Sequence, residues 1–175
     1  MTSRALGLAT DDDAFLARSW ARAWRPVDLE SDEAVAEVEG ELPRELCGTL
    51  YRNGPSQKIL PREGYEALHL FDGDALVHAF RLEDGTARYR SRFVRNASFE
   101  LEQRLGPSRQ SFFNFNVSDP APEGDARVQP NTNVVWHGGK LLAMVENAYP
   151  FALDPRTLES LGEHLPADPM LGFAT

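Results

Sequence analysis

The sequence predicts an all-β fold made of consecutive antiparallel sheets, and three observations support that class. From Gly48 onward, short runs rich in β-branched and aromatic residues alternate with turn-forming residues. The dipeptides Asp84-Gly85 and Gly138-Gly139 suit tight hairpin turns. Two four-stranded meanders follow one another along the chain, as in a β-propeller, where each blade buries its faces against its neighbours. Two blades cannot close a ring, so we expect an incomplete β-propeller over residues 48–175.

Composition and charge indicate a globular domain and argue against a nucleic-acid-binding protein. The 175 residues are 42% hydrophobic and 26% charged, which is enough apolar material for one globular domain. A total of 18 basic and 27 acidic residues gives a formal net charge of -9, the wrong sign for binding phosphate backbones, so we expect no nucleic-acid partner. Cys47 is the only cysteine, which excludes an intrachain disulfide and favours a cytoplasmic setting. No apolar run is long enough to span a membrane.

Residues 1–47 are predicted to form an N-terminal arm with one short amphipathic helix. Residues 11–24 begin with three aspartates, which favour a helix N-terminus, and carry apolar side chains at helical spacing. These side chains are Phe15, Leu16, Trp20 and Trp24. We interpret the helix as packing its aromatic stripe on the body of the protein. Contact with a membrane surface is the alternative, which the acidic start of the helix disfavours.

The first blade, about residues 48–95, is predicted as a meander of four strands. One hairpin turns at Asp84-Gly85, and the two-residue turn fixes its register. The predicted pairs are Leu82 with Ala87, Phe80 with Tyr89, and Leu76 with Phe93. A further hairpin, turning at Gly73-Asp74, would place residues 67–71 beside the same strand, and the run GTLYRN ahead of them is predicted as the fourth strand. The face that carries Phe80 is nearly all apolar, and we expect it to pack between blades.

The second blade, about residues 131–165, follows an insertion over residues 96–130 that is rich in polar and turn residues. Four strands are predicted from the runs NVVW, LLAMVE, FAL and LESLGEH. A tight turn over residues 137–140 and a type I turn over residues 154–157 connect them. The last segment, residues 171–175, has the character of a fresh strand, so we expect the chain to be a portion of a longer propeller.

Two histidines in the first blade are the first candidates for chemistry. The hairpin predicted at Gly73 places His69 opposite His78, with Asp72 and Asp74 in the turn between them. Two imidazoles and a carboxylate are ligands that can hold a metal ion. The alternative is structural, because both imidazoles fall on the apolar face and the aspartates suit a turn. We prefer the structural interpretation for all four residues.

Glu146 is the next candidate, because it ends the apolar run LLAMVE. A carboxylate among buried side chains needs a partner. The alternative is that the strand ends there and the carboxylate is solvated, which the local pattern alone favours. The sequence contains no glycine-rich phosphate loop between a strand and a helix, no serine nucleophile elbow and no H-E-x-x-H motif.

Four runs of the sequence resemble, in order and spacing, the carotenoid cleavage oxygenase family. They are GTLYRNGPSQ (48–57), HLFDGDALVHAFRLEDGTARYRSRFVR (69–95), NTNVVWHGGKLLAMVENAYPFALDPRTLESLG (131–162) and GFAT (172–175). The family includes apocarotenoid and lignostilbene dioxygenases and the retinal-pigment-epithelium isomerohydrolase. The resemblance covers about residues 40–175 and corresponds to the N-terminal third of the family. Ala75 stands where the family usually has glycine, and Leu70 where an aromatic residue is common.

The resemblance implies a seven-bladed β-propeller whose axis holds a non-haem ferrous iron, Fe(2+), bound by four histidines. Such an iron uses O2 to cleave a conjugated or stilbene-type C=C bond into two carbonyl products. Glu146 matches a glutamate of the family that accepts the second N–H of an iron-bound imidazole, which orients the ring and balances charge. On this basis we expect Glu146 to be buried and functional in the complete protein.

None of the four histidines in the chain matches an iron ligand of the family, and the first ligand is expected just after Thr175. We therefore expect the chain to be a fragment that binds no catalytic iron and is inactive alone. The implied partners are an apolar polyene or stilbene-type small molecule, O2 and, for extraction of the substrate, a membrane surface. A non-enzymatic β-propeller or β-sandwich binding module is the alternative, which explains the meanders but not the ordered runs.

Overall fold

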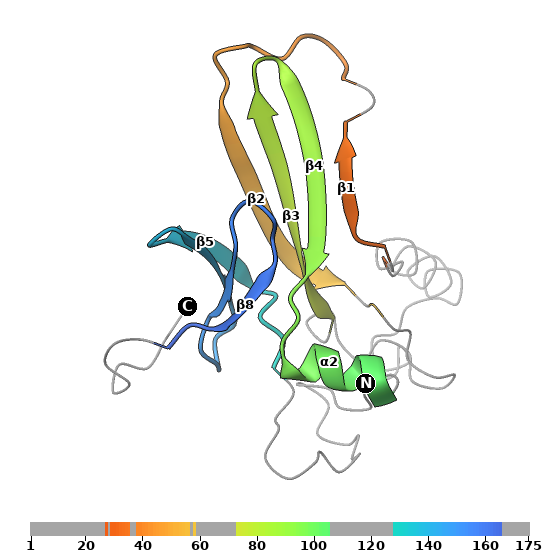
Figure 1. Ribbon diagram of the computed structural model, residues 1–175, viewed down its shortest axis with the longest axis vertical. Coiled ribbons are helices and arrows are strands. Elements are labelled where there is room, and N and C mark those ends of the chain that lie inside the picture. The colour runs from red at the N-terminus through yellow and green to blue at the C-terminus, as the bar shows by residue number, and fades with distance from the viewer. Residues whose placement is uncertain are drawn as a thin grey trace, which may run out of the picture.

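The computed structural model describes residues 27, 29–35, 38–56, 58, 73–105 and 128–165. Within these ranges the chain forms two four-stranded antiparallel sheets and one helix (Figure 1). The first sheet contains β1 (Ser31–Ala34), β2 (Gly48–Ser56), β3 (Asp74–Glu83) and β4 (Thr86–Phe93). Helix α2 (Ala97–Leu105) precedes the second sheet, which contains β5 (Asn133–His137), β6 (Lys140–Met144), β7 (Phe151–Leu153) and β8 (Ser160–Glu163). The predicted all-β class is confirmed.

The β3–β4 hairpin has the predicted register. The predicted pairs are all present: Leu76 with Phe93, Phe80 with Tyr89, and Leu82 with Ala87. Asp84 and Gly85 form the turn with φ angles of 47° and 70°. Two successive residues at positive φ are the geometry of a type I′ turn, whose twist matches that of the flanking strands. The Asp-Gly sequence therefore determines how these strands pair.

The predicted hairpin at Gly73-Asp74 is wrong. Asp74 is the first residue of β3 and pairs with Ser56 of β2. In the sheet order β1-β4-β3-β2, both edges of β3 are hydrogen-bonded, so no edge is left for residues 67–71, which lie outside the described residues. The fourth strand comes from the N-terminal arm instead, because β1 pairs with β4 at the far edge of the sheet (Figure 1).

The second sheet has the predicted order, β5-β6-β7-β8. His137 pairs with Lys140 across the tight turn, in which Gly138 and Gly139 both have positive φ. The strands predicted from sequence differ from β5–β8 by only a few residues at their ends. This sheet is therefore a meander, as expected.

Helix α2 was not predicted, and it lies inside the stretch interpreted as a loop insertion. Asn96 caps the helix, because its Oδ1 accepts the N–H of Phe99 at 2.9 Å. Glu100 lies in the first turn, where a negative charge is favourable. Phe99 is buried against Phe93 of β4, with 5.5 Å between the ring centroids. The capping asparagine and the acidic first turn were the signals that could have revealed the helix.

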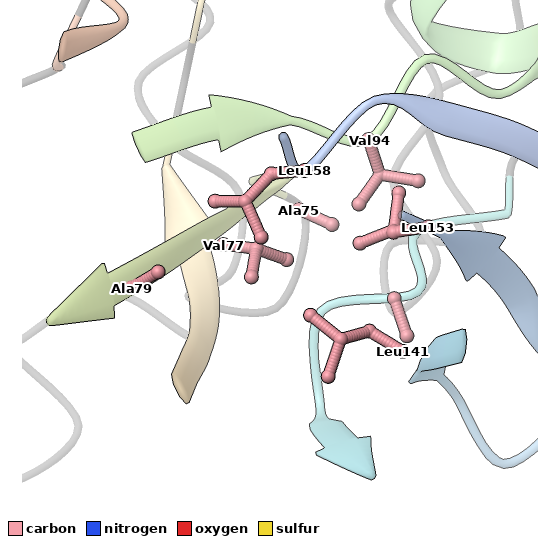
Figure 2. Packing of buried hydrophobic residues seen from close by; sticks show 8 residues of the cluster. Ala75, Val77, Ala79, Val94, Leu141, Leu153 and Leu158 are labelled. Carbon is pink, nitrogen blue, oxygen red and sulfur yellow. The ribbon is translucent and has the colours of Figure 1, made fainter. Parts of the chain in front are cut away.

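The two sheets pack on each other through one hydrophobic core (Figure 2). Small side chains of β3, together with Val94 directly after β4, form one side of the core, and side chains of the second sheet and of the turn before β8 form the other. The buried members are Ala75, Val77, Ala79, Val94, Leu141, Ala143, Leu153 and Leu158. Because small side chains let two sheets approach closely, the alanines of β3 lie where the sheets meet.

The face that carries Phe80 takes no part in the core between the two described sheets, and its packing against another blade stays a prediction. Side chains alternate along a strand, so Ala75, Val77 and Ala79 project from the face opposite to Phe80. Phe80 lies on the outer face of the first sheet, half-buried against Tyr89 with 5.0 Å between the ring centroids. The alternation along β3 is confirmed, and the face that contacts the second sheet is the one that carries Ala75, Val77 and Ala79.

Other predicted elements lie outside the described residues. They are the amphipathic helix over residues 11–24, the rest of the insertion over residues 106–127 and the strand over residues 171–175. Among the residues that the structure describes, no helix has the length and apolar character needed to cross a membrane.

Candidate functional site

The candidate site is the Thr132–Glu146 pair at the end of the β5–β6 hairpin, and the second sheet that carries this pair is attached to β2. Two side chains of β2 cross between the sheets to bond backbone carbonyl groups. The Tyr51 hydroxyl donates to the Pro155 carbonyl at 2.7 Å. The Asn53 side-chain amide donates to the carbonyl groups of Pro130 and Asn133, at 2.7 and 2.9 Å. These bonds attach the second sheet to β2 at two separate points.

The turn that receives the Tyr51 bond is ordered by Asp154. Its Oδ1 accepts the backbone N–H groups of Arg156 and Thr157, each at 2.8 Å. These bonds, that of Thr157 first, lower the pKa of Asp154 below its ordinary value. The predicted type I turn therefore has a carboxylate that holds it in shape, and Tyr51 bonds a fixed carbonyl.

The segment that leads into β5 is held by buried polar side chains. Asn131 is 3% exposed and donates its Nδ2 to the Gly73 carbonyl at 2.7 Å. Asp74 is also 3% exposed, and its Oδ1 accepts a hydrogen bond from Gln129 Nε2 at 3.5 Å. A buried polar group is stabilising only when it is bonded, so these residues fix the path of the chain between the sheets.

Thr132 and Glu146 meet at the end of the β5–β6 hairpin. The Thr132 hydroxyl donates to Glu146 Oε2 at 3.2 Å, and the Thr132 N–H donates to the Met144 carbonyl at 3.1 Å. Glu146 is exposed in this chain, although it follows the four buried residues 141–144. Its carboxylate is thus held from one side by the Thr132 hydroxyl and is open to a further hydrogen-bond donor on the other. The expectation that Glu146 is buried concerns the complete protein and stays a prediction.

His78 has a different neighbour from the one predicted. Its partners in the sheet are Arg52 of β2 and Ser91 of β4, because β3 has strands on both sides, so the predicted pairing with His69 is wrong. His78 Nδ1 bonds the Tyr89 hydroxyl at 2.7 Å. Burial, and then the Arg52 charge, lower the pKa of His78 below 6.5.

The predicted candidates do not gather into a metal centre in the described part of the chain. His69 and Asp72 lie outside the described residues. His137 is exposed in its turn, and His164 follows β8. No three His, Cys, Asp or Glu side chains among the described residues lie close enough to hold a metal ion.

Sequence reasoning missed Thr132 and Asn53. The β5–β6 register could have revealed Thr132, since pairing outward from His137 and Lys140 brings the residue before Asn133 close to the residues after Met144. Nothing comparable pointed to Asn53, because its bonds join residues 77 and 80 positions apart in the sequence. Their role depends on how the two sheets pack.

Comparisons with known proteins agree on one family. A family model described as retinal pigment epithelial membrane protein matches residues 24–172. Isoeugenol monooxygenase of Pseudomonas nitroreducens is 40% identical over 142 residues, which is 78% of this chain and 28% of that protein. Lignostilbene-alpha,beta-dioxygenase isozyme III of Sphingomonas paucimobilis is 37% identical over 79% of this chain and 28% of its own length. Apocarotenoid-15,15'-oxygenase of Synechocystis is 35% identical over 83% of this chain and 30% of its own length.

Solved structures give the same result. A Synechocystis apocarotenoid oxygenase with one threonine replaced by alanine has a TM-score of 0.74 at 32% identity, over 85% of this chain and 32% of that one. Lignostilbene dioxygenase of Pseudomonas brassicacearum has a TM-score of 0.66 at 33% identity, over 80% of this chain and 29% of that one. The chain therefore spans less than a third of the length of the relatives it matches.

Proposed function

The chain belongs to the carotenoid cleavage oxygenase family, and from this membership we propose that it is part of an oxygenase that uses O2 to cleave a conjugated C=C bond. The products of such a cleavage are two carbonyl compounds. The matched relatives are named for isoeugenol, lignostilbene, resveratrol, apocarotenoids and carotenoids. All of these compounds contain a double bond conjugated to an aromatic ring or a polyene.

The Thr132–Glu146 pair is the observation in this chain that supports the proposal most directly. The related Synechocystis structures include variants in which a threonine or a glutamate is replaced, and those two residues are 14 positions apart. Thr132 and Glu146 are also 14 positions apart, and they are joined by a hydrogen bond. A tryptophan directly precedes the glutamate in the relative, where this chain has Val145.

We propose that Glu146 accepts the N–H of an imidazole that binds the catalytic metal. A carboxylate in that position fixes the orientation of the ring and offsets part of the metal charge. The related structures include a cobalt-substituted enzyme, which supports a metal cofactor in the family. The described residues of this chain do not themselves form a ligand set. On this proposal Fe(2+), which would supply the oxygen chemistry, is held by histidines from parts of the relatives that this chain does not cover.

Several finer properties belong to the same proposal. We propose that the 175 residues alone have no oxygenase activity, because the residues that we assign here orient a metal ligand and do not supply one. An aromatic alkene is the first substrate class to test, since the relatives named for such compounds are 37–40% identical and those named for carotenoids are 33–35% identical. A cytoplasmic location and transient contact with a membrane surface are proposed for a protein that takes up apolar substrates.

The test is a cleavage assay on the protein expressed from its complete coding region and loaded with Fe(2+). Isoeugenol, a hydroxylated stilbene and an apocarotenal are supplied separately with 18O-labelled O2. We expect paired carbonyl products from at least one substrate, with label in a carbonyl oxygen. The absence of cleavage of all three by a folded, metal-loaded protein would contradict the proposed function and favour the non-enzymatic binding module.

A further inference from the structure

Asn53 is a side chain of the first sheet that reaches the backbone on both sides of Thr132. It lies on β2, opposite Val77 of β3, and its face of the strand points toward the second sheet. One amide nitrogen bonds the carbonyl groups of Pro130 and Asn133, at 2.7 and 2.9 Å. The two accepting residues bracket Thr132 along the chain. The conformation of the Thr132 backbone is therefore tied to a residue of another sheet.

The orientation of the Asn53 amide follows from its partners. Both partners are carbonyl oxygens, which accept and cannot donate, so the NH2 group and not the oxygen must face them. The Asn53 Oδ1 is buried and has no hydrogen-bond partner in the part of the chain that the structure describes. Among the described residues, the two donated bonds are those that hold this side chain, and a rotation that exchanged nitrogen and oxygen would place three oxygens together.

Thr132 links this anchor to Glu146. Its N–H bonds the Met144 carbonyl at 3.1 Å, and its hydroxyl bonds Glu146 Oε2 at 3.2 Å. The hydroxyl can reach the carboxylate only while the backbone around Thr132 keeps its present conformation. The chain of bonds from Asn53 through Thr132 to Glu146 is continuous and crosses from one sheet to the other.

We propose that Asn53 is a positioning residue, which holds the Thr132 hydroxyl against Glu146 by fixing the carbonyl groups of Pro130 and Asn133. This inference rests on the proposed function for its effect on catalysis, but the positioning itself is a property of this chain. Asn53 touches neither substrate nor metal in this proposal. It acts only through Thr132, by setting where the Glu146 carboxylate can lie.

Tyr51 provides a matched control within the same strand. It lies two residues before Asn53, points to the same face of β2, and also bonds a backbone carbonyl of the second sheet, at 2.7 Å. Its bond ends in the turn at Pro155 and not beside Thr132. Loss of the Tyr51 bond therefore weakens the attachment of the two sheets without acting on the Glu146 carboxylate.

The first experiment compares Asn53→Asp, Asn53→Ser and Tyr51→Phe in the 175-residue chain by amide hydrogen exchange and by 1H–15N spectra. Asp is close in size to Asn, but its carboxylate oxygens would repel the two carbonyl oxygens. Ser is too short to reach the carbonyl groups, so it removes the two hydrogen bonds without adding this repulsion. We expect both Asn53 variants to speed exchange of the Thr132 amide about tenfold and to shift its resonance, as expected for loss of a buried hydrogen bond. Tyr51→Phe should leave the Thr132 resonance in place. Equal effects of Tyr51→Phe and of whichever Asn53 variants fold, or no effect at Thr132, would overturn the proposal.

The second experiment measures kcat per bound metal and KM in the complete protein. We expect Asn53→Ser to lower kcat per metal by about 10-fold or more, as for loss of a residue that orients a metal ligand, with KM little changed. Tyr51→Phe should keep kcat per metal within about twofold of the parent. Thr132→Val should lower kcat as well. The double variant Asn53→Ser/Thr132→Val should have the same kcat as Thr132→Val alone, because both residues act through the hydrogen bond between Thr132 and Glu146. Additive losses of kcat in the double variant would contradict the proposal. A complete protein without any oxygenase activity would contradict only the proposed function, because the hydrogen-exchange experiment does not depend on catalysis.

Discussion

Arg90 forms an ion pair with Asp32 of the edge strand β1, with 2.7 Å between Nη2 and Oδ2. The same guanidinium donates through Nη1 to the carbonyl of Arg156, in the turn between β7 and β8 of the second sheet. One side chain of β4 therefore joins the edge strand, the first sheet and the second sheet. The hydrogen bond from Arg90 is the main cause that lowers the pKa of Asp32 below 3.8.

Replacement of Asp32 by asparagine should loosen β1 in a pH-dependent way. Because the folded chain lowers the pKa of Asp32, the carboxylate contributes stability that is present above pH 3.8 and lost as the pH falls through the folded pKa. We expect Asp32→Asn to lower the urea midpoint at about pH 6 and to match the parent chain at about pH 2. Glu33→Gln, at the next and exposed position of β1, is the control. A constant difference between parent and Asp32→Asn at all pH values would contradict this assignment.

Leu141 should be among the most sensitive positions of the core between the sheets. It is fully buried and packs among the small side chains of β3 (Figure 2). We expect Leu141→Ala to lower the free energy of unfolding by about 2–5 kcal/mol, from lost burial and the cavity that remains. Leu161→Ala removes the same atoms from a residue that is 56% exposed and should cost less than about 1 kcal/mol. Similar losses for both variants, measured by urea unfolding, would mean that the sheets do not pack through this core.

His78 should titrate below its ordinary pKa of 6.5, because burial and the Arg52 charge disfavour the imidazolium. As the pH falls below 6.5 the unfolded chain takes up this proton before the folded chain does, so folding stability decreases. We expect Arg52→Gln to raise the pKa of His78 toward 6.5, and Arg52→Lys, which keeps the charge, to raise it less. NMR titration of the His78 ring protons measures both shifts. A pKa of 6.5 or above in the parent chain would show that the imidazole is solvated.

The sequence predicted the contacts between residues that are close along the chain and missed those between residues that are far apart along it. The hairpins at Asp84-Gly85 and Gly138-Gly139 were predicted in register because a two-residue turn determines pairing locally. The pairing of β1 with β4 was not predicted, since it joins residues 60 positions apart in Ser31 and Ser91. β1 has the sequence SDEA, without apolar alternation, and is attached by polar contacts.

The residues of the candidate site also differ in whether the sequence could identify them, according to how local their interactions are. Glu146 was found because a carboxylate after an apolar run is unusual and because the resemblance assigned it a role. Thr132 was within reach of the hairpin register, but a threonine before a strand is common and carries no signal of its own. Asn53 could not be identified from the sequence, because its role depends on two backbone carbonyl groups that come close to it only when the two sheets pack together.

The purified 175-residue chain should contain far less than one iron per chain. The described residues form no cluster of three His, Cys, Asp or Glu side chains, and the resemblance assigns the ligands elsewhere. Iron analysis after anaerobic loading with Fe(2+) and desalting measures the stoichiometry. Tight binding of one Fe(2+) per chain would contradict this, and would require ligands that include His69 or other residues outside the described ranges. The same chain without loading provides the baseline for adventitious metal.

Glu146→Gln should have little effect on the 175-residue chain and a large effect on catalysis in the complete protein. In this chain Glu146 is exposed, and among the described residues its carboxylate accepts a hydrogen bond from Thr132, so we expect the free energy of unfolding to change by less than about 0.5 kcal/mol. In the complete protein an amide presents a donor to the imidazole N–H as readily as an acceptor, so metal content or cleavage activity should fall about 10–100-fold. Glu159→Gln, at an exposed position directly before β8, should change neither. Full metal content and full activity in Glu146→Gln would show that the carboxylate is only a solvated end of β6, which is the alternative that the local sequence pattern favoured.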